Sequence, residues 1–180
     1  QGTAIAEVLF GDYNPAGRLV QTWPTGLQQL PRMLDYNIRN GRTYMYFKEK
    51  PLYPFGYGLS YTGFEYSALQ VSSQTMQKNG SITVTLNIKN TGQRQGDEVV
   101  QLYVQYPGSK VVRPLKELKG FSRTGLKPGE TKTVSFELRA ESLAWWNENS
   151  DKWEVESGPV NIMIGSSSDD IRLQRTLNVN

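Results

Sequence analysis

The stretch SITVTLNIKN, residues 81–90, alternates strictly between apolar and polar residues, and this alternation constrains the fold more than any other feature of the chain. Ile82, Val84, Leu86 and Ile88 share one parity, whereas serine, threonine, asparagine and lysine occupy the other. Successive side chains of a β-strand point to opposite faces of a sheet, so this pattern places the apolar side chains on one face. The stretch is therefore predicted to be a half-buried strand.

Period-two patterns recur through the second two-thirds of the chain. The further predicted strands are residues 64–73, 98–106, 131–139, 160–165 and 172–179, of which the first is weaker and the last is interrupted by Arg175. Turn signals such as Pro128-Gly129 separate these runs, and Trp146 and Trp153 flank a predicted hairpin tip. About seven short strands joined by turns predict an antiparallel sandwich of two sheets.

The first 45 residues have a different character. The stretch TAIAEVLF carries apolar residues at helical spacing, and Gly11 follows it as a C-cap. Residues 18–23 are predicted to form a strand. One short helix and one strand cannot bury their own apolar faces. We therefore expect this segment to be the end of a larger α/β domain. On this expectation the chain is a fragment, and the body of that domain precedes its first residue.

The segment RTYMYFKEKPLYPFGYGLSYTGFEY, residues 42–66, holds nine aromatic rings in 25 residues. Its prolines and glycines predict an irregular strap that must pack against something to stay ordered. We favour a strap buried between two domains, with Tyr53, Phe55 and Tyr57 packed across the junction. The alternative is that some of the rings contact a sugar substrate. The expected division is 1–45 for the α/β remnant, 46–66 for the interdomain strap and 67–180 for the sandwich.

Four residues are candidate carbohydrate contacts, namely Arg42, Tyr44, Tyr46 and Trp145. Tyr44 and Tyr46 would reach the edge of a substrate cleft, and Arg42 would stack on a ring or pair with an acid of a missing domain. Trp145 and Trp146 are neighbours, so in a strand they face opposite ways. We expect one of them to enter the sandwich core and the other to be exposed, where it would stack on a sugar or be covered by a loop.

Composition excludes several kinds of chemistry. The chain has no cysteine and no histidine, so it can form no disulfide, no Ser-His-Asp triad and no zinc site built from these ligands. We expect no cofactor and no metal.

The net charge is +3 with scattered basic residues, which does not indicate a nucleic-acid partner. No apolar run approaches the about 18 residues needed to cross a bilayer, and no signal peptide is recognisable, so the protein is cytoplasmic or its start is missing.

The acidic residues do not predict a catalytic pair. Asp97-Glu98 and Asp169-Asp170 are the adjacent acids, and neighbours on a strand point to opposite faces. Asp12 stands beside a turn and is expected to cap it. We therefore assign no catalytic residue.

Two further motifs are interpreted as turns. Asn147, Asn149 and Asp151 are spaced like the start of a calcium loop, but Lys152 occupies the position where such a loop needs glycine. A polar hairpin tip explains the spacing better. Asn79-Gly80-Ser81 fits a glycosylation acceptor and fits a hairpin turn equally well.

Three stretches resemble family 3 glycoside hydrolases, the β-glucosidases and β-xylosidases. They are AEVLFGDYNPAGRLVQTWP, GRTYMYFKEKPLYPFGYGLSYTGFEY and EVVQLYVQYPGSKVVRPLKELKGFSRTGLKPGETKTVSFEL. They are similar, in this order, to the end of the family's α/β sandwich domain, the segment that leaves it and the C-terminal fibronectin-III-like domain. The resemblance implies a mainly β chain, with an immunoglobulin/fibronectin-III-like antiparallel β-sandwich preceded by a remnant of an α/β domain.

The resemblance also implies an activity for the parent protein. Family members are retaining exo-glycosidases, secreted or periplasmic, with a nucleophile and an acid/base carboxyl group about 5 Å apart. In the family the nucleophile lies in an N-terminal barrel, and the acid/base lies upstream of the equivalent of Gln1. Neither motif is present here. The implied partners are the missing barrel and α/β domain of the same protein, and an oligosaccharide substrate in the parent enzyme.

Two functional classes follow from the sequence. The preferred one is the C-terminal structural portion of a β-glycosidase, periplasmic or extracellular and inactive on its own. The alternative is a stand-alone carbohydrate-binding or adhesion module with a fibronectin-III-like fold. The residues that would separate glucosides from xylosides are expected to lie outside this chain.

Overall fold

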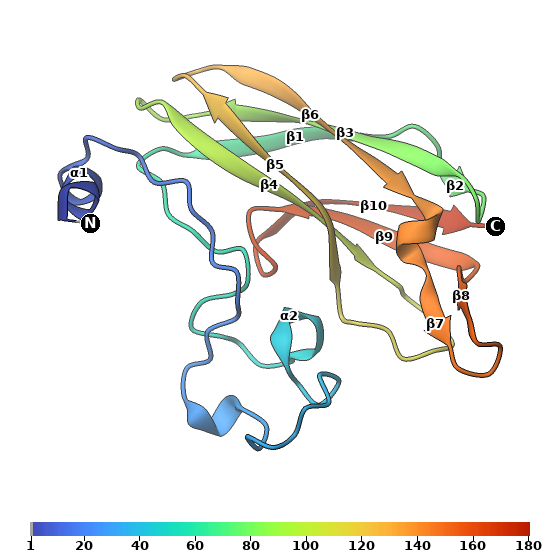
Figure 1. The fold of residues 1–180 in the computed structure, drawn as a ribbon. Coiled ribbons are helices and arrows are strands. Elements are labelled where there is room, and N and C mark those ends of the chain that lie inside the picture. The colour runs from blue at the N-terminus through green and yellow to red at the C-terminus, as the bar shows by residue number, and fades with distance from the viewer. Residues whose placement is uncertain (1) are drawn as a thin grey trace.

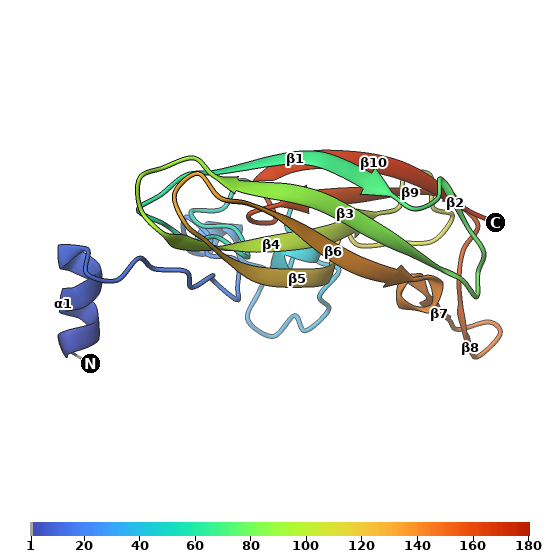
Figure 2. The same cartoon turned by 90° about the horizontal axis from the view of Figure 1, so that it is seen from above.

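Two β-sheets pack face to face in the computed structural model of the chain, which describes residues 2–180 (Figures 1 and 2). The first sheet has the order β1-β3-β6 and the second the order β2-β10-β9-β4-β5. Neighbouring strands are antiparallel except for the parallel pair β2 and β10. The bounds are β1 (Phe64–Val71), β2 (Thr75–Met76), β3 (Ser81–Asn90), β4 (Gly96–Gln105), β5 (Glu117–Leu126), β6 (Thr131–Arg139), β9 (Gly158–Gly165) and β10 (Ile171–Val179). The prediction of an antiparallel sandwich is confirmed.

Shorter elements surround the sandwich. They are the helices α1 (Gly2–Phe10) and α2 (Thr43–Tyr46), the 3-10 turns η1 (Leu27–Gln29) and η2 (Ala140–Leu143), and a hairpin of β7 (Trp145–Asn147) and β8 (Lys152–Glu154). The predicted first helix is confirmed, and Gly11 after it has the left-handed φ of 84° of a C-cap. Within residues 2–180, none of the helices has the length and apolar character needed to cross a membrane.

The strand expected at residues 18–23 is wrong. The segment forms only an isolated bridge between Trp23 and Tyr53, with a few hydrogen bonds to the chain around Tyr57. A regular ladder cannot continue because Pro54 has no N–H to donate and Gly56 turns the backbone with a φ of 81°. The two segments therefore run side by side without forming a sheet.

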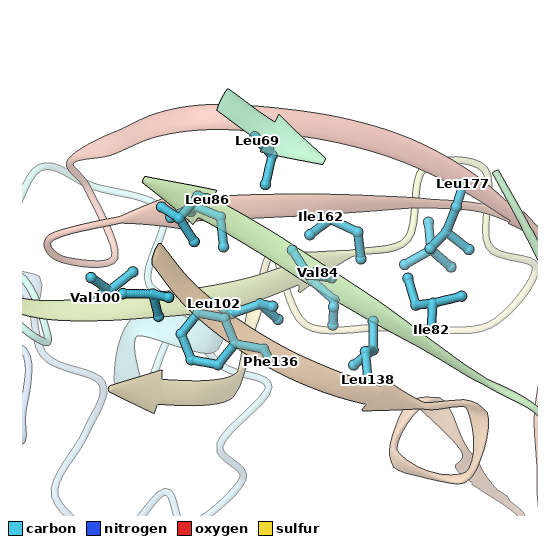
Figure 3. Packing of buried hydrophobic residues seen from close by; sticks show 14 of the residues in the cluster. Leu69, Ile82, Val84, Leu86, Val100, Leu102, Phe136, Leu138, Ile162 and Leu177 are labelled. Carbon is cyan, nitrogen blue, oxygen red and sulfur yellow. The ribbon is translucent and has the colours of Figure 1, made fainter. Parts of the chain in front are cut away.

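Apolar side chains from both sheets meet in one core (Figure 3). On β3, the alternating residues predicted to be buried are indeed buried, with Val84, Leu86 and Ile88 almost completely inaccessible. Leu102 and Ile162 join them from the second sheet. Every residue of the core cluster lies between Tyr66 and Val179, so none of the first 60 residues contributes to this core.

Strand β4 differs from the other strands because both of its faces are buried. Val100, Leu102 and Val104 belong to the core, while Gln101 and Tyr103 are buried on the opposite face of the sheet. A second layer must therefore cover β4 from outside the sandwich. The segment that contains α2 supplies this layer, and Figure 1 shows it on the side of β4 and β5 away from β1, β3 and β6.

The distribution of the core predicts that a fragment of residues 64–180 folds without the rest of the chain. We expect a β-type circular dichroism spectrum, dispersed amide signals and cooperative melting, at a lower temperature than for the whole chain because Gln101 and Tyr103 lose their cover. Residues 1–45 alone should give a random-coil spectrum, since α1 buries none of its residues. A cooperatively folded N-terminal fragment would show that the domain border lies elsewhere.

Candidate functional site

The junction between residues 14–58 and the five-stranded sheet is the candidate functional site. Here the N-terminal part of the chain is fixed to the sandwich by polar and aromatic contacts between residues far apart in the sequence. The junction determines where the apolar surface of the N-terminal part is held.

A buried ion pair lies at one end of this junction. Arg18 donates a hydrogen bond from Nη2 to Oε2 of Glu98 over 2.8 Å, and the two side chains are only 11% and 3% exposed. The other carboxylate oxygen accepts a 2.6 Å hydrogen bond from the Tyr66 hydroxyl. Burial, with the Glu98 carboxylate beside it, raises the pKa of Tyr66 far above its ordinary value, so the phenol remains a donor. Both oxygens of Glu98 are thus engaged in structural contacts.

The Gln101 side chain forms a second link on the outer face of β4. Its Nε2 donates to the carbonyls of Gly56, at 3.1 Å, and Ser166, at 2.6 Å, while its Oε1 accepts from the Tyr103 hydroxyl. A Cβ on Gly56 would lie 2.0 Å from Gln101 Oε1, and the φ there is 81°, so only glycine fits. The Ser168 amide donates to the carbonyl of Phe55, which fixes the same point of the strap from the turn after β9.

Three aromatic rings pack together beside these hydrogen bonds. Tyr44 stacks on Phe55 with the ring centroids 4.3 Å apart, and its ring lies edge-on to Tyr103 at 5.9 Å. The Tyr44 hydroxyl accepts a 3.0 Å hydrogen bond from the Leu118 amide of β5. Burial raises the pKa of Tyr44 as well. These contacts hold Tyr44 and Phe55 in the junction.

The structure does not gather the four candidate carbohydrate contacts into one site. Tyr44 lies in the junction, and Tyr46 is half-buried beside a hollow also lined by Arg39 and Asn40. Arg42 donates from Nε to the carbonyl of Asp35 at 2.6 Å and from Nη2 to that of Arg32 at 2.9 Å, so it braces its own loop. Trp145 lies on β7, in a separate hairpin. Their role in sugar binding stays a prediction.

The expectation that Trp145 or Trp146 enters the sandwich core is wrong. Trp145 is half-buried, Trp146 is 43% exposed, and neither belongs to the core cluster. The reason is that β7 and β8 form their own two-stranded sheet instead of joining either sheet of the sandwich. Trp146 packs instead on Trp153 across the hairpin.

Two hollows lie on either side of Tyr44 and Phe47. One, of about 360 Å³, has mainly apolar walls that include Val20, Ile38 and Phe55. The other, of about 410 Å³, is more polar, and its lining includes Thr22, Lys48, Lys116 and Asp169. Both are within the size range of small-ligand pockets. Their walls come from segments that are distant in the sequence, so no local pattern could have identified them.

The adjacent acids pair with different basic side chains. Asp97 pairs with Arg123 at 2.6 Å, whereas its neighbour Glu98 pairs with Arg18. Asp170 is held by Arg172. Across residues 2–180, no group of three or more acidic, histidine or cysteine residues could hold a metal ion.

The predicted hairpin tip at residues 147–152 is confirmed. The Asn149 amide donates to Oδ1 of Asn147 at 3.0 Å, and the Asp151 amide to the Asn147 carbonyl at 2.9 Å. Asn147 therefore closes the turn. The motif at Asn79-Gly80-Ser81 also forms a turn, where the Gly80 amide donates to the Gln77 carbonyl.

The N-terminal part of the chain exposes a large apolar surface. On the sandwich the core is self-contained, but α1 and the loop that follows it present side chains that are mostly in solvent. The side chains that are more than 70% exposed in this part are Leu9, Phe10, Val20, Leu27, Met33, Leu34 and Tyr36. Exposed apolar side chains in such number are typical of segments that pack against another part of a protein.

Two family models match the chain. Residues 1–61 match the glycosyl hydrolase family 3 C-terminal domain, and residues 98–168 match the fibronectin type III-like domain. The first match ends within the aromatic strap, and the second begins in β4.

Curated proteins and solved structures agree with these matches. The chain is 45% identical over 179 residues to a periplasmic β-glucosidase of Salmonella typhimurium, covering 93% of the chain and 23% of that protein. It is 43% identical over 170 residues to a putative β-xylosidase of Formosa agariphila, covering 93% and 22%. The crystal structure of β-D-glucoside glucohydrolase from Trichoderma reesei superposes with a TM-score of 0.89 at 37% identity, covering 99% of this chain and 29% of that one. The chain thus spans about a quarter of the length of the curated relatives it matches.

The buried ion pair predicts a large effect of replacing Arg18. Arg18→Met should lower the free energy of unfolding by about 3 kcal/mol, because it leaves the Glu98 carboxylate buried without its hydrogen-bonded arginine. The matched control is Arg123→Met, which breaks a similarly short but more exposed pair with Asp97 and should cost much less stability. Urea unfolding of both variants measures the difference. Equal effects would contradict a structural role for the buried pair.

Asp170 predicts a pH-dependent contribution to stability. The hydrogen bonds from Arg172 and Ser166 lower the pKa of this carboxyl, with Arg172 the larger cause. A lowered folded-state pKa stabilises the fold above the unfolded pKa of about 3.9, and the contribution is lost as the pH falls through the folded pKa. The stability difference between the natural chain and Asp170→Asn should therefore shrink on acidification. Urea unfolding over a pH series tests this, and a constant difference would show that the carboxylate does not contribute.

Proposed function

The chain belongs to glycoside hydrolase family 3, and we propose that it is the structural, non-catalytic portion of a retaining β-glycosidase that hydrolyses β-glucosides or β-xylosides. It matches the C-terminal domain of that family and its fibronectin type III-like domain. In this role the chain completes the α/β domain and straps it to the sandwich. The catalytic carboxyl groups come from the upstream part of the protein.

One observation carries the proposal, namely the contrast between the two parts of the chain. The sandwich buries its own core between Tyr66 and Val179. The N-terminal part leaves side chains such as Phe10 and Leu34 more than 80% exposed. A partner that buried these side chains would stabilise the assembled protein by roughly 1.5–3 kcal/mol for each side chain. The upstream α/β domain and barrel are the proposed partners that cover them.

The junction determines how this apolar surface is presented. Arg18 and Gly56 belong to the two segments that run side by side, and both are fixed to β4 through Glu98 and Gln101. These contacts restrain the direction in which α1 leaves the sandwich. A restrained docking surface would hold the α/β domain in one position, and so help to fix the acid/base carboxyl relative to the nucleophile. The chain's residues act here by positioning and not by proton transfer.

The substrate and the location are proposed from the relatives. Those similar to the chain include proteins named β-glucosidase and others named β-xylosidase, so either glucosides or xylosides are proposed as oligosaccharide substrates. The similarity to a periplasmic enzyme supports a periplasmic or extracellular location.

The proposed function predicts a clear division of activity. The full-length protein should release nitrophenol from an aryl β-glucoside or an aryl β-xyloside, and the 180-residue chain alone should release none, because its acids do not converge. Phe10→Asp should lower the melting temperature of the full-length protein but not that of the isolated chain, where Phe10 is 83% exposed.

Two outcomes would overturn the proposal. One is turnover by the isolated chain that disappears when one of its own acids is replaced. The other is a full-length protein that hydrolyses neither substrate.

A further inference from the structure

The hairpin of β7 and β8 presents two exposed tryptophans on one face. Trp146 and Trp153 are directly opposite in the register, and their ring centroids are 5.6 Å apart with an interplanar angle of 70°. Trp146 is 43% exposed and Trp153 is 69% exposed. Each of the two rings therefore keeps a large surface in contact with solvent. An indole is the largest apolar side chain, so this exposure calls for an explanation.

The turn that carries these rings is well ordered by its own hydrogen bonds. Asn147 accepts from the amides of Asn149 and Asp151, and Ser150 donates from its hydroxyl to Oε1 of Glu154. The hydrogen bond from Ser150, followed by one from Asn147, lowers the pKa of the Glu154 carboxyl. A braced turn holds the indoles in place before a ligand arrives, which reduces the entropy lost on binding.

The hairpin lies away from α1, which is one of the segments proposed to meet the upstream domain. Figures 1 and 2 place β7 and β8 at the end of the sandwich near the C-terminus, and α1 at the opposite end. The exposed apolar side chains of α1, such as Phe10, belong to that other end. The upstream domain that docks on α1 therefore does not explain the exposed indoles.

The size of the exposed patch is too small for a stable protein partner. The exposed fractions of Trp146 and Trp153 add up to little more than one whole tryptophan side chain, which is about 250 Å². A specific protein interface needs about 800 Å² on each side. One or two indole faces are instead suited to a small flat apolar surface, such as the C–H face of a pyranose ring.

Polar side chains surround the indole pair. Glu148, Asn149, Asp151 and Lys152 all lie at the exposed tip of the hairpin, next to the rings in the sequence and in the turn. They can donate to and accept from hydroxyl groups at the edge of a sugar ring. An apolar face bordered by polar donors and acceptors is the combination that a glycan needs.

We propose that Trp146 and Trp153 bind a β-linked xylan or glucan chain, with an indole stacked on a pyranose face and the tip residues contacting its hydroxyls. The ligand class rests on the proposed function, because a β-glycosidase encounters such chains. The site would hold the enzyme on polymeric substrate and takes no part in bond cleavage. The simpler explanation is that the pair only stabilises the hairpin across the two strands.

Affinity electrophoresis of the full-length protein in native gels separates these explanations. Gels contain xylan, mixed-linkage β-glucan, or α-linked dextran as the control polysaccharide. We expect xylan or β-glucan to retard the natural protein and dextran to leave it unaffected. Trp153→Leu keeps an apolar contact with Trp146 but removes the aromatic face, and should weaken the retardation about tenfold, equivalent to about 1.4 kcal/mol.

Two controls make the result specific. Phe121→Leu removes a ring of similar exposure, 70%, from β5 and should leave the retardation unchanged. Trp153→Tyr keeps an aromatic face and should retain most of the binding. Hydrolysis of small aryl glycosides should be the same in all three variants, so a failure of this site is distinguishable from a failure of the proposed function.

The proposal is overturned if the natural protein is not retarded by either β-linked polysaccharide, or if Trp153→Leu and Phe121→Leu behave alike. It is also overturned if Trp153→Leu and Trp153→Tyr lose binding only in proportion to a fall in melting temperature. That last result would assign the pair to hairpin stability alone. Quenching of the natural protein's tryptophan fluorescence by a xylan oligosaccharide gives a second readout that needs no variant, and its absence would contradict the site.

Discussion

The buried ion pair between Arg18 and Glu98 is the interaction on which the arrangement of the two parts of the chain depends. The pair joins residues 80 positions apart and is almost completely shielded from water. Charges in such a setting are costly unless both are matched, so the geometry around them is tightly specified. Tyr66 completes the set by satisfying the second oxygen of Glu98. The N-terminal part of the chain cannot move off the sandwich without exposing or orphaning these groups.

This constraint gives the aromatic strap its function. Residues 42–63 have no helix or strand beyond the four residues of α2, yet Tyr44 and Gly56 are fixed on β4 and β5 by Tyr103, Gln101 and Leu118. The sandwich therefore supports the strap, and the strap in turn pairs with the segment around Leu19 and Trp23. Under the proposed function, such a support would hold the upstream domain in one position.

The sequence predicts the sandwich well because burial in a strand has a local signature. The alternation along β3 and the glycine after α1 are both properties of neighbouring residues, and both are confirmed. The strap and its partners could not be found in this way. Arg18 and Glu98 are ordinary charged residues until the fold brings them together, and Gln101 is notable only as a polar residue inside an apolar run. Residues 18–23 fail as a strand because Pro54 and Gly56 of the facing segment cannot support a ladder.

Amide hydrogen exchange on the isolated chain tests most directly whether the strap is a fixed part of the sandwich. The informative amides are those of Leu115, Leu118 and Ser168, which donate to the Met45 carbonyl, the Tyr44 hydroxyl and the Phe55 carbonyl. If the junction is fixed as described, they exchange only in larger opening events, far more slowly than the exposed loop at residues 33–40. If Leu115 and Ser168 instead exchange as fast as that loop, the strap is loosely attached, and the proposed support for the upstream domain is contradicted.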